Sequence, residues 1–292
     1  MTAETLAQVV VSGLLTGMIY ALIAAGLSLI FGLMDVVNFA HGEFLMTAMY
    51  ATFVLYITLS IDPLFLLPMV AVFLFAIGVV VYRVLIVRAL SVKVNSGMVQ
   101  IFATFGLGIF LRGIAQFVFS PDFKSLRGTM LSDKTVSVLG VFMPLPQLAA
   151  SLVCVVAFIG LWLLTTKTHF GRALEATRED SEAVALIGVD RHFIFAMGWG
   201  IGAATVGVAG VMLSTFYYIS PGVGVTFALI AYVVVALGGF GSLPGALVAG
   251  LAIGLVEALT TLLIPPSLKQ VGVFGLYLLV LFVRPRGLFG NL

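Results

Sequence analysis

The chain of 292 residues is 62% hydrophobic and only 9% charged, and its net charge is +2. Soluble domains carry about 25% charged residues, because their surfaces face water. So few charges cannot cover a water-facing surface, which excludes a soluble globular protein and a disordered one. The small and dispersed positive charge also argues against binding to nucleic acid. The composition therefore indicates an integral membrane protein that crosses the bilayer several times.

Apolar stretches of the length of a membrane span recur along the chain. A spanning helix needs about 20 mostly apolar residues. In chain order the candidate stretches are 9–33, 42–59, 64–87, 98–119, 148–165, 192–218, 225–237, 245–263 and 268–283. They predict an all-α fold with eight or nine transmembrane helices in a single domain over residues 1–292. The short stretch 225–237 and the junction at 36–42 are candidates for broken or re-entrant helix, which a membrane tolerates only inside protein or beside a cavity.

The distribution of lysine and arginine predicts the orientation, because cytoplasmic connections are enriched in these residues. Nine of the 14 basic residues fall in three segments: Arg83, Arg88, Lys93, Lys167, Arg172, Arg178, Arg191, Arg284 and Arg286. Placing all three segments in the cytoplasm is consistent with nine crossings, an outside N-terminus and a cytoplasmic C-terminus. The segment 120–146 then lies outside. With eight crossings one terminus changes side, and Arg284 and Arg286 then predict that the C-terminus stays in the cytoplasm.

Glycines spaced four residues apart occur within several apolar stretches. Small residues at this spacing let helix backbones approach closely in lipid, so we predict tight helix–helix packing there. The pairs are Gly13 with Gly17, Gly198 with Gly202, and Gly250 with Gly254. The one cysteine of the chain, Cys154, lies in an apolar run and is interpreted as a packing residue.

The sequence contains no motif of an enzyme. It has no Gly-x-x-x-x-Gly-Lys-Ser/Thr loop for ATP, no His-Glu-x-x-His and no Gly-x-Ser-x-Gly. His41, His169 and His192 are far apart, and one cysteine builds neither a disulfide framework nor a metal site. We therefore predict no catalytic residue, no metal and no cofactor.

A cluster of polar residues, Asp35, Asn38, His41 and Glu43, lies where the first apolar stretch meets the second. Ionisable side chains inside a membrane are costly and usually functional. Because all four side chains could not face lipid, the cluster is interpreted as the lining of a conduit or as a packed helix break beside one. A plain interfacial loop is the alternative.

Two further ionisable residues lie within apolar stretches. Arg112 falls in 98–119. The alternative to a functional role is that its side chain snorkels to the outer interface. Glu257 falls in 245–263. The alternative to a functional role is that it forms a structural hydrogen bond between two helices. Each is a candidate for a polar site inside the membrane.

The segment 167–191 is the longest charged connection. Apolar and small residues recur in it at a spacing of three to four, which predicts a helix over 171–187. Both signs of charge and several small residues favour docking into a protein groove over lying on an anionic lipid surface. Gly188 can end this helix in a left-handed turn at no steric cost.

Four stretches together resemble a known family. They are GLSLIFGLMDVVNFAHGEFLM (26–46), FATFGLGIFLRGIAQ (102–116), GRALEATREDSEAVALIGVD (171–190) and ALGGFGSLPGALVAGLAIGLVE (236–257), and the tail reads LVLFVRPRGLFG. The chain resembles the permease subunits of bacterial ABC importers for branched-chain amino acids, over almost its whole length. Glu182-Ala183-Val184-x-x-x-Gly188 follows the Glu-Ala-Ala-x-x-x-Gly core of the importer coupling loop, and departs from it at Val184.

The resemblance implies a multi-pass protein of the bacterial inner membrane. Its partners would be a second homologous permease, two cytoplasmic ABC ATPases that hydrolyse ATP, a periplasmic amino-acid-binding protein and membrane lipid. The implied substrate path contains Asn38, His41, Glu43, Thr104 and Glu257. The implied ATPase-coupling residues, in a loop at about 167–191, are Gly171, Arg172, Glu175, Arg178, Glu182, Ala183 and Gly188.

Three alternatives stay open from the sequence. The permeases of urea and short-chain amide importers are similar, since the binding protein selects the substrate. An ion-coupled transporter that works alone would need charges near the middle of the membrane, and Glu257 and the 35–43 cluster could supply them. An intramembrane enzyme would use Asp35, His41 and Glu43, but no nucleophile stands in a recognised relation to them.

Overall fold

The structure is a computed structural model that describes residues 3–35, 37–92, 95–138, 140–186 and 188–290. Within these ranges, eight helical segments are long and apolar enough to cross a membrane, and α10 is a shorter apolar helix. This agrees with the eight or nine crossings expected. Lys93 and Ile187, which belong to predicted segments, lie outside the described residues.

In the described part of the chain, nine apolar helical segments are connected by shorter helices and one pair of strands. In chain order the elements are α1 (Ala3–Met34), α2 (His41–Leu59), α3 (Pro63–Val81), the π-helix η1 (Tyr82–Ile86), α4 (Val87–Leu90), α5 (Ser96–Phe119), β1 (Thr135–Val138), β2 (Val141–Pro144), α6 (Leu145–Lys167), α7 (His169–Glu179), α8 (Ser181–Leu186), α9 (Arg191–Ser214), α10 (Val223–Gly238), α11 (Leu243–Leu263), the 3-10 helix η2 (Pro266–Leu268) and α12 (Gln270–Val283).

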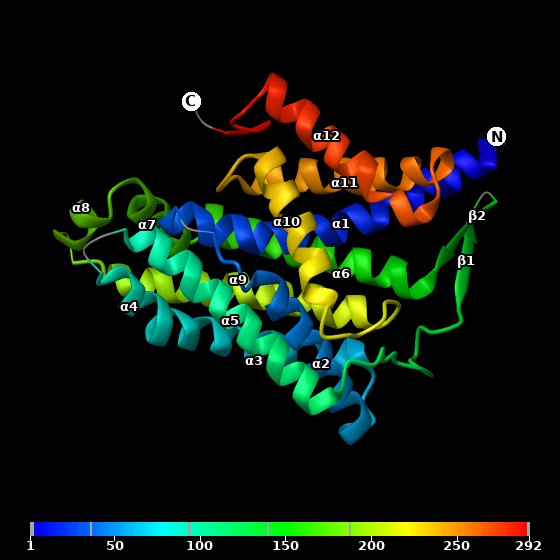
Figure 1. Cartoon of the computed structure of the whole chain (residues 1–292), viewed down its shortest axis with the longest axis horizontal. Coiled ribbons are helices and arrows are strands. Elements are labelled where there is room, and N and C mark those ends of the chain that lie inside the picture. Colours follow the sequence, from blue (N-terminus) through cyan, green and yellow to red (C-terminus); the bar gives the residue numbers. More distant parts are fainter. Residues whose placement is uncertain (1–2, 36, 93–94, 139, 187, 291–292) are drawn as a thin grey trace.

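The long helices lie side by side along the long axis of the molecule (Figure 1). One end carries α4, α7, α8 and the C-terminus, and we call it the basic end because the three basic segments lie there. The opposite end carries the N-terminus and the hairpin β1–β2, and we call it the hairpin end (Figure 1). The two termini of the chain therefore lie at opposite ends of the bundle.

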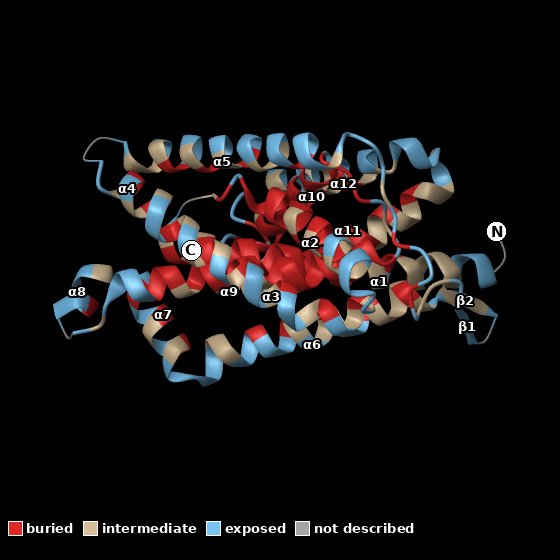
Figure 2. Cartoon of the chain, turned by 90° about the horizontal axis from the view of Figure 1, so that it is seen from below, coloured by how far each residue is buried: buried red, intermediate tan, exposed pale blue. Residues whose placement is uncertain are grey.

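The core of the bundle is formed by α1, α9 and α10, which are mostly buried, whereas α5, α6 and α12 lie at the outside (Figure 2). The outward side chains of α5 are large and apolar, including Phe102, Phe110 and Phe117. Exposed apolar surface of this extent is unusual for a soluble protein and suits a lipid or protein environment. Cys154 is fully buried on α6, in agreement with a packing role.

Glycines permit the closest helix contacts, as the four-residue spacing predicts. On α1, Gly13 and Gly17 face Gly254 and Gly250 of α11, and a Cβ added at Gly254 would lie 2.4 Å from the Gly13 carbonyl oxygen. Gly202 of α9 approaches α1 as closely, because a Cβ added there would lie 2.8 Å from the Gly26 carbonyl oxygen. Backbones meet here because no side chain separates them.

The segment 120–146 contains a feature that the sequence reasoning did not predict. β1 and β2 form an antiparallel hairpin, with Thr135 paired to Pro144 and Val138 to Val141. The side-chain amide of Gln8 on α1 accepts from the Phe142 backbone N–H at 2.7 Å and thereby ties the hairpin to α1. The hairpin is a small addition at one end of an otherwise helical structure.

Candidate functional site: a re-entrant polar segment and a charged helix pair

The connection between α1 and α2 turns back into the bundle. α1 ends at Met34, yet the His41 ring, at the start of α2, lies 2.9 Å from the Ile23 carbonyl oxygen through its Nε2 atom. Ile23 lies about 16 Å before the end of α1, at a rise of 1.5 Å per residue. The chain just before α2, which we call the re-entrant segment (residues 35 and 37–40, since Val36 lies outside the described residues), therefore returns to the depth of the middle of α1. This confirms the expectation of a re-entrant break at this junction.

Asn38 shapes the re-entrant segment. Its side-chain Oδ1 accepts the Ala40 N–H at 3.0 Å, and its carbonyl oxygen accepts the His41 N–H at 3.2 Å. An asparagine that bonds the backbone two residues ahead builds a tight turn without help from other elements. Asn38 and His41 are fully buried, so these polar groups lie inside protein, as backbone at membrane depth requires.

Two neighbouring helices hold the segment from different sides. On α5, the Thr104 hydroxyl accepts the Phe39 N–H at 3.2 Å. On α10, the Tyr232 hydroxyl donates to the Asn38 carbonyl oxygen at 3.1 Å. The structure thus brings the predicted residues Asn38, His41 and Thr104 together around one turn of chain. Tyr232 joins them, although the sequence reasoning did not single it out.

Glu43, in the first turn of α2, forms an ion pair with Arg112 of α5. The bond joins Arg112 Nη2 to Glu43 Oε1, and the Glu43 side chain is only 4% exposed. Gly108, one turn before Arg112, lies beside the carboxylate: a Cβ there would stand 3.4 Å from Glu43 Oε2. Arg112 is therefore a partner of the polar cluster, through its ion pair with Glu43.

An apolar pocket adjoins the re-entrant segment. It has a volume of about 290 Å³ and lies between the segment, α1, α10 and α12. The pocket volume is near the lower limit for small-ligand sites, which are about 300–1,000 Å³. Phe39 and Tyr232 line it with their rings 5.5 Å apart, and Leu27, Leu229 and Phe274 are among its other walls.

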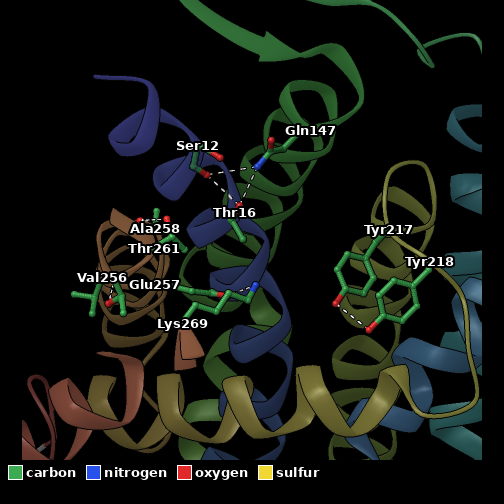
Figure 3. A network of polar contacts seen from close by, with 11 residues as sticks. Ser12, Thr16, Gln147, Tyr217, Tyr218, Val256, Glu257, Ala258, Thr261 and Lys269 are labelled. Atoms are coloured by element: carbon green, nitrogen blue, oxygen red, sulfur yellow. Dashed lines mark hydrogen bonds and ion pairs between the residues drawn. The ribbon is translucent and has the colours of Figure 1, made fainter. Parts of the chain in front are cut away.

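Glu257 belongs to a separate polar cluster near the hairpin end (Figure 3). Its carboxylate pairs with Lys269 Nζ at 2.6 Å, and a pocket of about 200 Å³ lies between α1 and α11 beside it. Close by, Gln147 Nε2 donates to the Thr16 hydroxyl at 2.9 Å. Among the described residues, no hydrogen bond or ion pair joins Glu257 to the re-entrant segment. The structure therefore does not bring Glu257 to the other predicted path residues.

The charged connection forms two short helices, and the prediction of one helix over 171–187 is wrong. α7 ends at Glu179 and α8 begins at Ser181, because Asp180 leaves the helical conformation. The Asp180 carboxylate accepts the N–H groups of Glu182 and Ala183 at 3.0 and 2.9 Å. Asp180 therefore acts as the N-cap of α8, a role in which aspartate is strongly preferred.

The coupling residues predicted from the sequence divide into an inward and an outward set. Gly171 packs where α6 turns into α7, and a Cβ there would lie 1.9 Å from the Thr165 carbonyl oxygen. Arg172, Glu175, Glu182 and Ala183 are exposed. Gly188 has φ +87°, the left-handed conformation expected after the helix. The charged face of the pair thus points away from the bundle.

Arg178 links α7 to the glycine-rich loop between α10 and α11. Its Nη1 atom donates to the Gly241 carbonyl oxygen at 3.3 Å. The C-terminal tail clamps the same region, because the Leu288 and Phe289 N–H groups donate to the carbonyl oxygens of Leu237 and Gly238 at 2.8 and 3.0 Å. The sequence reasoning did not connect these three segments, since they are distant along the chain.

Buried polar groups inside an apolar helix bundle, together with a charged helix pair at one end, define a polytopic membrane transport protein. The chain belongs to the family described as branched-chain amino acid transport system / permease component, whose model matches residues 9–282. Membership of this family confirms the resemblance stated from the sequence motifs.

Curated relatives cover nearly the whole chain. The high-affinity branched-chain amino acid transport system permease protein BraD of Pseudomonas aeruginosa is 32% identical over 97% of this chain and 95% of its own. The permease protein LivH of Escherichia coli (strain K12) is 31% identical over 97% of this chain and 95% of its own. A probable LivH of Methanocaldococcus jannaschii is 28% identical over 82% of this chain and 76% of its own. No solved structure matches the chain.

Proposed function

We propose that this chain is the membrane permease of an ATP-driven importer that passes branched-chain amino acids from a periplasmic binding protein to the cytoplasm. The observation that carries the proposal is the re-entrant segment, a buried polar turn deep in an apolar bundle, in a chain of the branched-chain amino acid permease family. The printed names of the relatives supply the substrate class.

The substrate path is proposed to run past Asn38, His41, Glu43 and Thr104. These side chains are buried, come from three segments and gather at the depth of the middle of α1. The apolar pocket lined by Phe39 and Tyr232 suits a hydrophobic side chain, as leucine, isoleucine and valine have. Glu257, which lies near the hairpin end, stays a predicted residue of the substrate path.

The helix pair α7–α8 is proposed to dock one of two cytoplasmic ABC ATPases. Its outward residues include Arg172, Glu175, Glu182 and Ala183, and Leu186 at the tip of α8 is 89% exposed. An exposed leucine among mixed charges suits a protein groove, since interfaces combine an apolar centre with a polar rim. In this arrangement the basic end faces the cytoplasm and the hairpin end faces the periplasm of a bacterial inner-membrane protein. A second, related permease completes the membrane part of the importer.

Reconstitution tests the transport function. The chain alone, in nanodiscs, is expected to show no ATPase activity, because its sequence holds no phosphate-binding loop. The complex with its second permease, ATPases and binding protein is expected to take up leucine, but not urea, into proteoliposomes. This uptake is expected to require ATP. ATP hydrolysis or leucine uptake by the single chain would contradict the proposal, as would urea uptake in place of leucine.

Alanine variants test the path. Asn38→Ala, His41→Ala and Glu43→Ala are each expected to lower uptake while the complex still assembles, because each removes a buried polar group from the turn. Cys154→Ala is the control, since Cys154 is buried on α6 away from the segment. Normal uptake by all three variants would make the turn a purely structural feature.

A double variant tests the docking helices. Ala183→Trp with Glu182→Lys places a bulky ring and an opposite charge on the exposed face of α8. Both side chains point away from the bundle, so membrane insertion is expected to be unchanged. ATPase retention in a pull-down and uptake in vesicles are expected to fall together. Full retention with full uptake would leave α8 without a docking role.

A further inference from the structure

The Glu43–Arg112 ion pair lies within the membrane-spanning part of the bundle. Arg112 is seven residues, or about 10 Å, before the end of α5 at Phe119. The exposed side chains next to it on α5, Phe110 and Ile114, are apolar. Glu43 lies in the first turn of α2, three residues after the re-entrant segment. The pair therefore sits at the depth of apolar side chains, where a charge needs a polar environment.

The bonding capacity of Arg112 is largely unused. A guanidinium group has five N–H donors, and the pair with Glu43 engages Nη2. Arg112 Nε is buried and has no partner among the described residues, and the side chain as a whole is 34% exposed. An arginine with free donors and an open side, at membrane depth, must face water, a polar partner or a polar solute in the working transporter.

Further unpaired polar atoms lie in the residues just before Glu43, and Gly108 leaves space beside its carboxylate. Asn38 Nδ2 and His41 Nδ1 are buried without partners among the described residues. Gly108 leaves the volume of a methyl group open beside the Glu43 carboxylate, at 3.4 Å from Oε2. Buried polar groups normally find partners, so the unpaired Arg112 Nε beside the ion pair indicates a site for a polar ligand.

We propose that Arg112 and Glu43 bind the charged head group of the amino acid in transit, with the substrate inserted between them. The proposal rests on the proposed function, which makes the substrate an α-amino acid with one carboxylate and one ammonium group. The carboxylate accepts two N–H bonds from Arg112, the geometry that arginine favours, and the ammonium donates to Glu43. Arg112 and Glu43 each exchange their partner for an opposite charge on the substrate, so neither charge is left unpaired.

This arrangement selects zwitterions. A neutral solute such as a sugar or a urea would part the ion pair without replacing either charge, and leaving a buried charge unpaired is costly. Arg112 is thus a specificity-determining residue of the path, although its side chain lies on the outermost layer of the bundle.

Paired substitutions separate binding from a merely structural role. Glu43→Leu with Arg112→Met replaces the pair by apolar side chains of similar size, a change that is often neutral for stability. Glu43→Gln with Arg112→Gln keeps an amide hydrogen bond between α2 and α5, in case the apolar pair does not assemble. Gly113→Ala is the matched control, because Gly113 follows Arg112 on α5 and has open space around it.

The readouts are leucine uptake and ATPase stimulation by the loaded binding protein, in proteoliposomes that hold the complete importer. Both double variants are expected to lose uptake by at least about tenfold, the effect of losing a hydrogen bond to a charged group, and to keep the stimulation. Gly113→Ala is expected to match the wild type. Uptake retained by either double variant, or uptake and stimulation lost together in the variant that assembles, overturns the proposal. A wild-type importer that takes up no leucine would instead refute the proposed function itself.

Discussion

The Arg178 guanidinium donates a hydrogen bond to the Gly241 carbonyl oxygen, and thereby joins α7 to the loop between α10 and α11. The approach is close, because a Cβ at Gly241 would lie 2.8 Å from Arg178 Nη2, and Gly241 has φ +77°. α10 ends at this loop and carries Tyr232, whose hydroxyl holds the re-entrant segment. A movement of α7 can therefore reach the segment through one loop and one helix.

We expect Arg178→Ala to weaken the coupling between ATP hydrolysis and uptake. The lost hydrogen bond is exposed, so leucine uptake in proteoliposomes should fall about two- to tenfold while ATP hydrolysis continues. Arg88→Ala is the control, because Arg88 lies at the same end and donates to Val84 within its own helical segment. An equal loss in both variants would assign the effect to charge at the basic end and not to the link with Gly241.

Tyr232→Phe removes one hydroxyl group from the support of the re-entrant segment. The Asn38 carbonyl oxygen then loses the bond from α10, so we expect uptake to fall several-fold with assembly unchanged. Tyr277→Phe is the matched control, since Tyr277 lines the same apolar pocket on α12. If the two variants transport alike, the bond between Tyr232 and Asn38 has no part in transport.

Gly254→Ala tests the packing of α1 against α11. Its Cβ would lie 2.4 Å from both the Gly13 carbonyl oxygen and the Gly17 Cα atom, so the helices must separate. Overpacking of this kind costs about 1–3 kcal/mol, and the thermal unfolding midpoint in detergent should decrease. Gly275→Ala on α12 has open space around it and should leave the midpoint unchanged. A midpoint for Gly254→Ala equal to that of the wild type would mean that α11 shifts freely.

Single cysteines test the orientation. Native Cys154 is fully buried, so an engineered cysteine should dominate labelling by a membrane-impermeant maleimide. Ser137→Cys on β1 is expected to react in spheroplasts, and Arg286→Cys in the C-terminal tail only after permeabilisation. Both residues are exposed, so access from one side of the membrane decides the result. The opposite pattern would invert the proposed topology.

Local signals were sufficient for some features and were overlooked for others. The break between α7 and α8 has a local cause, since Asp180 caps α8, and an aspartate before Ser181 is an N-cap signal readable from the sequence. The helical periodicity of 171–187 masked it, because periodicity persists across a single capping residue. The hairpin β1–β2 was missed because its strands are four residues each, which is short for a strand pattern.

The sequence by itself determined the class of protein, the number of apolar helices to within one, the re-entrant junction and the basic segments. Each depends on composition over a short window, since hydrocarbon selects apolar residues whatever their neighbours are. Only the tertiary structure decided which polar groups meet. Arg112 and Glu43 are 69 residues apart, and Tyr232 lies 194 residues from Asn38. Pairing at such distances depends on how the helices pack, and here glycine contacts between α1, α9 and α11 set that packing.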